Sequence, residues 1–341
     1  MKFRHIAFPL LLALASSACM SHDVPRRQDT DLLKAVRRDD AASFDKALAS
    51  DALVNTADLQ GRTPLMLAAG DGREIFIKQL VDAGASLDVV DSRGQTALHF
   101  AASAGTPESV KILLYAGADP CIEDIYGWIP LAEAARLGNL DSAKLLLDAD
   151  SPIDSVDREG KTPLMHAAYS SRNSEQMCRM LLDAGADPKI YDNEKLDALM
   201  WAIKADNQNS ALLILNHLPS LKDEREFGLL VMQWAIKNGN VKIVEELIEK
   251  GVPLNLDTSD FTRVARALQM KGIAKIFANY GLLAENRTPL MWAAIYGQPR
   301  IAAMLIAHGA DVKAKDNKGN TALDYAKDHA TAKVIKTAGG E

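Results

Sequence analysis

A recurrence of 33 residues is the strongest constraint that this sequence places on its fold. Similar short motifs start at intervals of 33 residues: Thr63-Pro64-Leu65, Thr96-Ala97-Leu98, Ile129-Pro130-Leu131 and Thr162-Pro163-Leu164, and again Thr288-Pro289-Leu290 and Thr321-Ala322-Leu323. A chain of 341 residues would otherwise suggest about two or three compact domains. A fixed period of this length instead predicts one elongated stack of similar units, each burying its apolar face against its neighbours.

The residue types within each period predict a pair of helices followed by a turn. Thr is a good N-cap and Pro suits the first helical position, so each motif starts a helix. Small residues such as Ala68 and Ala69 follow and allow close packing between helices. A Leu-rich second helix then ends at glycine, as at Gly117, where a left-handed conformation stops a helix. Segments of the form Asp-x-x-Gly, such as 124–127, form the turn before the next unit.

These motifs resemble the ankyrin repeat, which implies an all-α solenoid of helix-turn-helix units joined by β-hairpin-like turns. About ten units cover residues 30–341 and start at 30, 63, 96, 129, 162, 197, 230, 263, 288 and 321. The first and last units carry many charged residues and are expected to cap the stack. The irregular stretch 197–287 is either a bend in the array or divergent packing, and its charged run 222–226 is expected to be an exposed loop.

The first residues have the layout of a secretory signal peptide. Lys2 and Arg4 precede the apolar run 6–15, which is too short to span a bilayer, and small residues lead to Cys19. The arrangement resembles a bacterial lipoprotein signal, although Ser16 stands where that motif usually has Leu. The resemblance implies removal of residues 1–18, lipidation of Cys19 and a tether over 19–29. In bacterial lipoproteins an Asp after the lipidated Cys retains the protein at the inner membrane, so Met20 implies the periplasmic side of the outer membrane. Cleavage after Ala18 to give a soluble periplasmic protein, and a retained anchor, are the alternatives.

The other two cysteines, Cys121 and Cys178, invite a disulfide in an exported protein. They lie about two units apart in the predicted stack, which exceeds the Cα separation of about 7 Å that a disulfide allows. We therefore expect two unpaired and mostly buried thiols.

The sequence shows no pattern typical of an enzyme, a metal site or a cofactor site. No His-Glu-x-x-His motif, paired-cysteine motif or phosphate-binding glycine loop occurs. Ankyrin repeats commonly have His at the fourth position of the opening motif, where it hydrogen-bonds backbone at the turn, and we assign His99 and His166 to this structural role. We expect a non-catalytic protein without a cofactor.

In ankyrin proteins, partners contact the turn tips and the exposed side of the first helix, which together line the concave surface of the stack. One sector of this surface is aromatic and apolar where most other tips are polar, and Trp and Tyr dominate interface cores. Trp128 has the alternative of packing onto neighbouring helices, and Trp201, Trp234 and Trp292 are expected to pack between units. The candidate residues for binding a protein are Ile125, Tyr126, Trp128, Leu137 and Tyr169, with Arg93 and Arg158 at adjacent tips.

The charge balance narrows the choice of partner. The formal net charge is −6 and becomes −8 once residues 1–18, with Lys2 and Arg4, are removed. This balance argues against nucleic-acid binding. An acidic groove would favour a basic protein partner, and an ordinary solvated acidic surface is the alternative. We expect a monomer that is held at the membrane only by an N-terminal lipid and that binds a protein partner. It is expected to inhibit an exported toxic enzyme, and the alternative is an envelope or stress-related scaffold.

Overall fold

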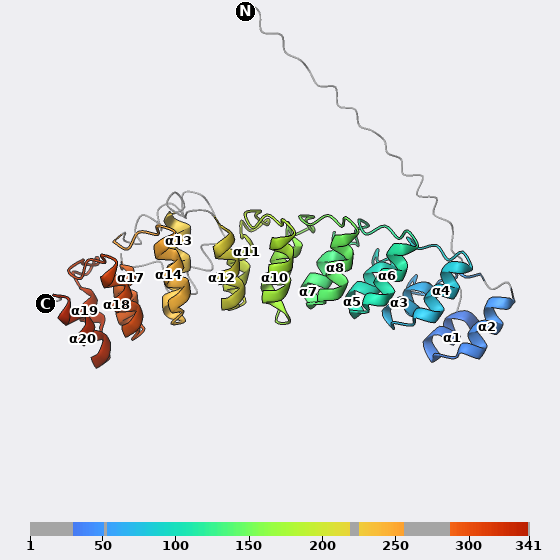
Figure 1. Ribbon diagram of the computed structural model, residues 1–341, viewed down its shortest axis with the longest axis horizontal. Helices are drawn as coiled ribbons and strands as arrows, with labels where there is room; N and C mark the ends of the chain where they lie inside the picture. Colours follow the sequence, from blue (N-terminus) through green and yellow to red (C-terminus); the bar gives the residue numbers. More distant parts are fainter. Residues whose placement is uncertain (1–29, 51–52, 219–224, 256–286, 340–341) are drawn as a thin grey trace, which may run out of the picture.

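The computed structural model describes residues 30–50, 53–218, 225–255 and 287–339. These residues form 18 helices and no strand. Figure 1 shows the helices side by side in one elongated, gently curved row, with α1 and α20 at opposite ends. The predicted all-α solenoid is therefore confirmed. The signal peptide and the tether predicted over residues 1–29 lie outside the described residues.

The helices come in pairs. The first helices are α1 (Asp31–Arg38), α3 (Pro64–Gly70), α5 (Ala97–Ala104), α7 (Pro130–Leu137), α9 (Pro163–Tyr169), α11 (Ala198–Lys204), α13 (Arg225–Lys237), α17 (Pro289–Ile295) and α19 (Ala322–Tyr325). The second helices are α2 (Ala41–Ala49), α4 (Glu74–Asp82), α6 (Pro107–Tyr115), α8 (Leu140–Asp148), α10 (Ser174–Asp183), α12 (Gln208–His217), α14 (Val241–Glu249), α18 (Pro299–Ala307) and α20 (His329–Thr337). Most first helices contact the first helix of the next described pair, but between the α11–α12 pair and the α13–α14 pair the main contact is that of α12 with α14. The buried residues of the pairs form one continuous core.

Local sequence explains where the first helices begin. Thr63, Thr162 and Thr288 are N-caps whose hydroxyl oxygens accept a hydrogen bond from the third helical amide, each at 3.3 Å. Proline follows each of these threonines at the first helical position, where its missing N–H costs nothing. The paired alanines in the middle of these helices, such as Ala167 and Ala168, are fully buried, so neighbouring helix backbones lie close together.

The irregular part of the sequence differs from the prediction at α13. This helix has 13 residues and begins at Arg225, so Arg225 and Glu226 are helical and the predicted exposed loop is wrong for these two residues. The rest of the charged run, 222–224, lies outside the described residues, as does most of the unit predicted at 263.

The chain resumes after residue 286 with a pair that stacks directly on α13 and α14. Helix α17 contacts α13, and α18 contacts α14. The Asn255 side chain connects the two pairs, because its Nδ2 donates to the Gly309 carbonyl at 3.1 Å and its Oδ1 accepts from the Asp311 amide at 2.8 Å. The neighbour of the α13–α14 pair in the stack is therefore the unit that starts at 288.

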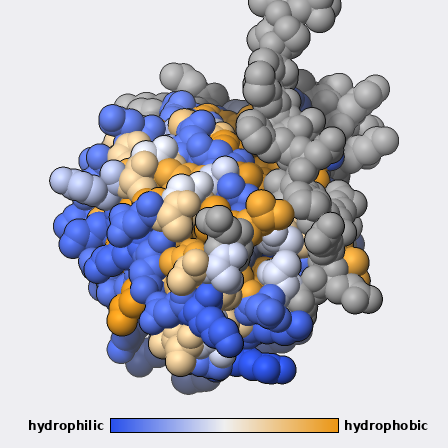
Figure 2. Space-filling model, turned by 90° about the vertical axis from the view of Figure 1, so that its right-hand side faces the viewer, coloured by the Kyte–Doolittle hydropathy of each residue, from blue (hydrophilic) through white to orange (hydrophobic). Residues whose placement is uncertain are grey.

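The first pair closes the stack at its end. Lys34 and Arg38 are exposed on α1, as expected for a cap, and Figure 2 shows hydrophilic residues over much of the left and lower part of this end of the molecule. Arg37 instead points to the next unit, where its Nη2 donates to Asp58 Oδ2 at 2.6 Å. The cap is thus polar outside and joined to its neighbour by an ion pair.

Candidate functional site

The turns between units are built around a buried aspartate. Asp124 Oδ1 accepts from the amides of Tyr126 at 2.8 Å and Trp128 at 3.0 Å, and the Gly127 amide donates to the Asp124 carbonyl at 2.9 Å. Gly127 has φ +80°, which an L side chain rarely adopts. The same pair of side-chain hydrogen bonds occurs in five other turns, at Asp58, Asp91, Asp157, Asp192 and Asp316. A carboxylate at this position therefore fixes the conformation of each tip.

Successive turns are joined to one another through their backbones. The amide of one tip donates to a carbonyl of the preceding tip at 2.8–2.9 Å: Ser92 to Gln60, Ile125 to Arg93, Arg158 to Tyr126 and Asn193 to Glu159. This chain of bonds places the predicted residues Arg93, Tyr126 and Arg158 in three adjacent tips. We call the turns 91–95, 124–128, 157–161 and 192–196, together with helices α5, α7, α9 and α11, the turn-and-helix face.

Five of the predicted contact residues are open to solvent on this face, among them Arg93 and Arg158 at their tips. Ile125 is 39% exposed and Tyr126 58% exposed at the 124–128 turn, and Tyr169 is 53% exposed at the end of α9. Leu137, at the end of α7, is half-buried. The Tyr169 ring meets the buried Trp201 edge-on, with 5.2 Å between ring centroids, so its position is fixed although it is exposed.

Trp128 is placed differently from these residues. It is half-buried and packs against the core, with its ring centroid 4.5 Å from that of His166. The guanidinium carbon of Arg136 lies 5.2 Å from the indole centroid. This placement corresponds to the packing alternative for Trp128. Trp201, Trp234 and Trp292 are buried, in agreement with their predicted packing role.

The two histidines on this face have different roles. His99 Nδ1 accepts from the Thr96 amide at 3.1 Å, and its Nε2 donates to the Trp128 carbonyl at 2.9 Å, so it bonds backbone at the turn as predicted. Burial lowers the pKa of His99, more than the neighbouring carbonyl and carboxylates raise it, which favours this neutral form.

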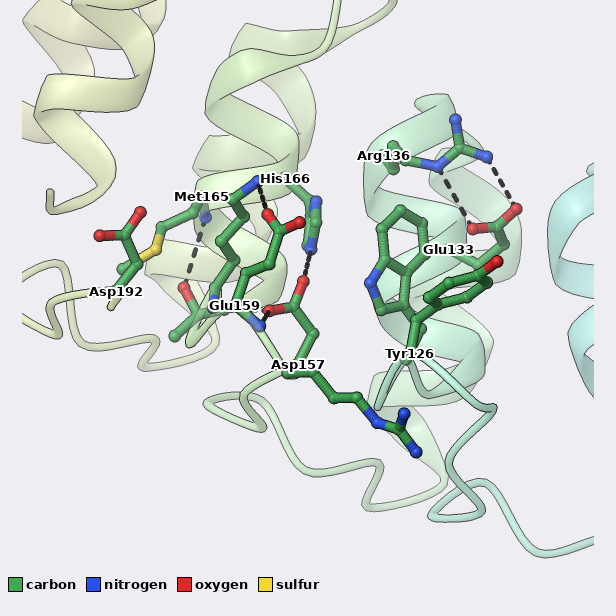
Figure 3. A network of polar contacts seen from close by, with 12 residues as sticks. Tyr126, Glu133, Arg136, Asp157, Glu159, Met165, His166 and Asp192 are labelled. Carbon is green, nitrogen blue, oxygen red and sulfur yellow. Dashed lines mark hydrogen bonds and ion pairs between the residues drawn. The ribbon is translucent and has the colours of Figure 1, made fainter. Parts of the chain in front are cut away.

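The assignment of His166 to the same position is wrong. Met165 follows Thr162 by three residues and occupies that position, whereas His166 Nε2 is bonded to Asp157 Oδ2 at 2.9 Å (Figure 3). Burial acts to raise the pKa of Asp157, but the hydrogen bonds from His166 and from the amides of Lys161 and Glu159 outweigh it and lower the pKa. The histidine therefore supports the turn that carries Arg158.

A spacing of nine residues reveals this second kind of support. His166 lies nine residues after Asp157, and Trp201 and Tyr325 follow Asp192 and Asp316 by the same interval. Trp201 Nε1 donates to Asp192 Oδ2 at 2.9 Å, and the Tyr325 hydroxyl donates to Asp316 Oδ2. The spacing of nine residues from the turn aspartate thus indicates the contact of His166 with Asp157, which the position of His166 relative to the opening motif does not.

The residue nine after Asp124 is Glu133, which is only 8% exposed. Its Oε1 accepts from the Ser103 hydroxyl at 3.2 Å and from Arg136 Nη2 at 2.8 Å. Figure 3 shows Glu133 and Arg136 near Tyr126. Glu133 thereby holds Arg136 over Trp128. The sequence prediction did not include either residue in the site.

The two cysteines are free, but only Cys178 is buried. Cys121 is exposed, so the prediction of burial is wrong for it. Cys121 stands where Asn55 and Asp88 stand in earlier units, and these two side chains accept an amide hydrogen bond from the next unit. The corresponding residue after Cys121 is Pro152, which has no N–H to donate, so no acceptor is needed there.

Within the described ranges, no group of three or more His, Cys, Asp or Glu side chains is arranged to hold a metal ion. None of the helices in those ranges combines the length and apolar character needed to cross a bilayer. What the face offers is exposed tyrosine and arginine side chains on fixed turns.

Comparison with known proteins identifies the repeats. Residues 32–124, 117–192 and 169–260 match the family described as ankyrin repeats (3 copies), and residues 281–326 match ankyrin repeats (many copies). The chain is similar to inversin of Mus musculus, with 25% identity over 184 residues, which are 54% of this chain and 15% of inversin.

Two channel proteins show similar matches. The transient receptor potential cation channel subfamily V member 5 of Rattus norvegicus is 30% identical over 171 residues, covering 48% of this chain and 21% of the channel. The potassium channel AKT2/3 of Arabidopsis thaliana is 34% identical over 133 residues, covering 39% of this chain and 16% of the channel. The chain thus matches about a fifth or less of each of these relatives. Ankyrin repeats imply a role in protein–protein interaction, and this chain belongs to the ankyrin-repeat family.

Proposed function

We propose that this chain is a non-catalytic protein of the bacterial cell envelope that binds a protein partner on its turn-and-helix face. The observation that carries the proposal is the exposure of Ile125, Tyr126 and Tyr169 on the turn-and-helix face. Backbone hydrogen bonds between successive tips and the contact of Tyr169 with Trp201 hold these residues in place. Exposed aromatic side chains on a rigid support lose little conformational freedom on binding, and this reduces the cost of association.

The location is proposed from the first residues of the chain. The basic start, the short apolar run and Cys19 favour export and lipidation at Cys19, with the protein facing the periplasm from the outer membrane. Replacing Cys19 with Ser is expected to abolish labelling by palmitate and to release the protein from membranes. Labelling that persists in this variant would contradict the proposed anchor and leave the proposed binding face untouched.

Within this function, we favour an inhibitor that occludes an exported toxic enzyme, and the second candidate is an envelope or stress-related scaffold. A fixed, continuous face across several units suits occlusion of an enzyme surface. The two roles differ in what happens to the activity of a captured enzyme. An inhibitor abolishes that activity in the complex, whereas a scaffold leaves it intact.

The test of the binding face is affinity capture from a native envelope extract with the full chain and with paired variants. Tyr126→Ala combined with Tyr169→Ala is expected to remove the specifically captured protein. The matched control is Tyr115→Ala on α6, because Tyr115 is 95% exposed but lies on a second helix, outside the turn-and-helix face. Circular dichroism checks that all variants keep their helices. Equal capture by the double variant and the control would refute the assignment of the face.

A further inference from the structure

The charge exposed on the turn-and-helix face is opposite in sign to that of the whole chain. The charged side chains of this face that are not buried are six cations and two carboxylates: Arg93, Arg136, Arg158, Lys161, Lys195 and Lys204 against Glu159 and Glu194. The other carboxylates of the same segments are buried, namely Asp91, Asp124, Glu133, Asp157 and Asp192. With the buried carboxylates included, the face carries six cations and seven carboxylates and is close to neutral overall, but the charged groups that a partner touches directly are mostly cations.

The buried carboxylates are engaged within the protein, and two of them lie beside arginines of the same face: Asp91 Oδ2 is 3.8 Å from Arg93 Nε, and Glu133 Oε1 is 2.8 Å from Arg136 Nη2. The Asp157 carboxylate accepts from two turn amides and is bonded to His166 Nε2, all at 2.8–2.9 Å. Asp192 accepts from two turn amides and from Trp201 Nε1. These carboxylates accept hydrogen bonds from the backbone of the tips and so fix the tip conformation. The side chains that project from the tips therefore determine which partner binds.

Cations and aromatic rings alternate across the face. Arg93, Tyr126 and Arg158 occupy three successive tips that are joined by backbone hydrogen bonds. On the helix side, Lys161 Nζ and Lys204 Nζ lie 4.4 Å and 3.9 Å from the ring centroid of Trp201. Arginine binds carboxylates through two parallel hydrogen bonds, and exposed tyrosines supply apolar contact between such pairs.

We propose that the turn-and-helix face binds an acidic segment of a protein. Carboxylates of that segment pair with Arg93 and Arg158, and its apolar side chains contact Ile125, Tyr126 and Tyr169. The proposal rests on the function proposed above and specifies the chemistry of its partner. It reverses the expectation of a basic partner, which followed from the total charge of the sequence.

A polypeptide fits this face better than a nucleic acid, the other common polyanion. Binding to single strands relies on open aromatic faces on which bases stack. The two indole rings of the face do not provide them, because the Trp128 ring is covered by His166 and Arg136, and the Trp201 ring by Tyr169 and the two lysines. The exposed aromatic rings of the face are those of Tyr126 and Tyr169. In addition, the negative total charge of the chain repels a long polyanion outside the immediate contact.

The test is selection of binders from a random-peptide display library against the full chain. The selected peptides are expected to contain an excess of Asp and Glu together with apolar residues. The variant Arg93→Glu combined with Arg158→Glu is expected to bind a selected peptide at least tenfold more weakly in fluorescence anisotropy. The matched control is Lys78→Glu with Lys111→Glu on α4 and α6, since these lysines are exposed on second helices, and it is expected to keep the affinity of the unmodified chain.

Several results would overturn the proposal. These are selection of basic or uncharged peptides, failure to select any peptide, equal affinity for both charge-reversal variants, and tighter binding of an oligothymidine than of the selected peptide. The failures of the two proposals are distinguishable. If the captured partner is lost with Tyr126→Ala and Tyr169→Ala but kept with Arg93→Glu and Arg158→Glu, the binding face stands and the acidic partner does not.

Discussion

Removal of the Asp157 side chain tests how the turn-and-helix face is held in place. In Asp157→Ala, the amides of Glu159 and Lys161 and the ring of His166 lose an acceptor at 2.8–2.9 Å in a site where the aspartate is only 8% exposed. A hydrogen bond to a charged group contributes about 1.5–3 kcal/mol. Because water reaches the emptied site in part, we expect a loss of roughly 3–5 kcal/mol in the free energy of unfolding.

Asp157→Asn is the matched variant. Its side-chain oxygen keeps the two amide bonds, and its NH₂ group faces His166, whose ring can accept after a change of tautomer. The expected loss is about 1 kcal/mol. Folding lowers the pKa of Asp157, so the ionised carboxylate stabilises the protein above the unfolded pKa of about 3.9, and this stabilisation is lost as the pH falls through the folded value. The stability difference between the unmodified chain and the Asn variant should therefore shrink below about pH 4.

Urea unfolding followed by circular dichroism measures both losses at unchanged slope, and hydrogen exchange at the amides of Glu159 and Lys161 reports the turn itself. The exposed Asp183, replaced with Ala, provides the control for removal of a surface carboxylate. The reasoning is refuted if Asp157→Ala costs no more than Asp183→Ala, or if the two amides exchange equally slowly in the Ala variant and the unmodified chain.

Three further outcomes are expected. Gly94→Ala should lower the free energy of unfolding by about 1–2 kcal/mol more than Gly84→Ala, as measured by urea unfolding. Both glycines have positive φ, but only at Gly94 would an added Cβ meet the next turn, 2.9 Å from a backbone nitrogen. His99 has a lowered pKa, so stability should fall as the pH drops below the unfolded value of about 6.5, and His99→Met should remove this slope in urea unfolding measured from pH 7 to 5. In a Cys19→Ser chain, a thiol reagent should modify only Cys121 before denaturation, because Cys178 is buried and burial raises its pKa to about 12; two modified thiols in the native chain would contradict this.

The sequence predicts the parts of this fold that depend on local chemistry. Thr162 and Pro163 start α9 because capping and a fixed φ act within one turn of helix. The Asp-x-x-Gly turns form for the same reason, since the carboxylate of Asp124 reaches amides only two and four residues away. The exposure of Tyr126 also follows from its place at a tip.

The sequence is less informative about contacts that depend on the neighbouring unit. Trp128 is covered by His166 and Arg136, and His166 comes from the next unit, so its half-buried state depends on stacking. Cys121 is exposed at a position whose side chain bonds the next unit elsewhere in the array. The sign of the charge on the turn-and-helix face could not be predicted from composition, because a count does not separate a buried ligand such as Asp157 from an exposed carboxylate such as Glu194.

The backbone bonds between successive tips also set a length scale for any partner that lies along them. Packed helices are about 8–10 Å apart, so neighbouring tips should repeat at about that distance. A β-strand rises about 3.3 Å per residue and turns its side chains to alternate sides, so residues three apart point in opposite directions. A polyproline II segment rises about 3.1 Å per residue with three residues per turn, so every third side chain returns to the same side after about 9 Å. An extended partner in that conformation would present one side chain to each of Arg93, Tyr126 and Arg158 in turn.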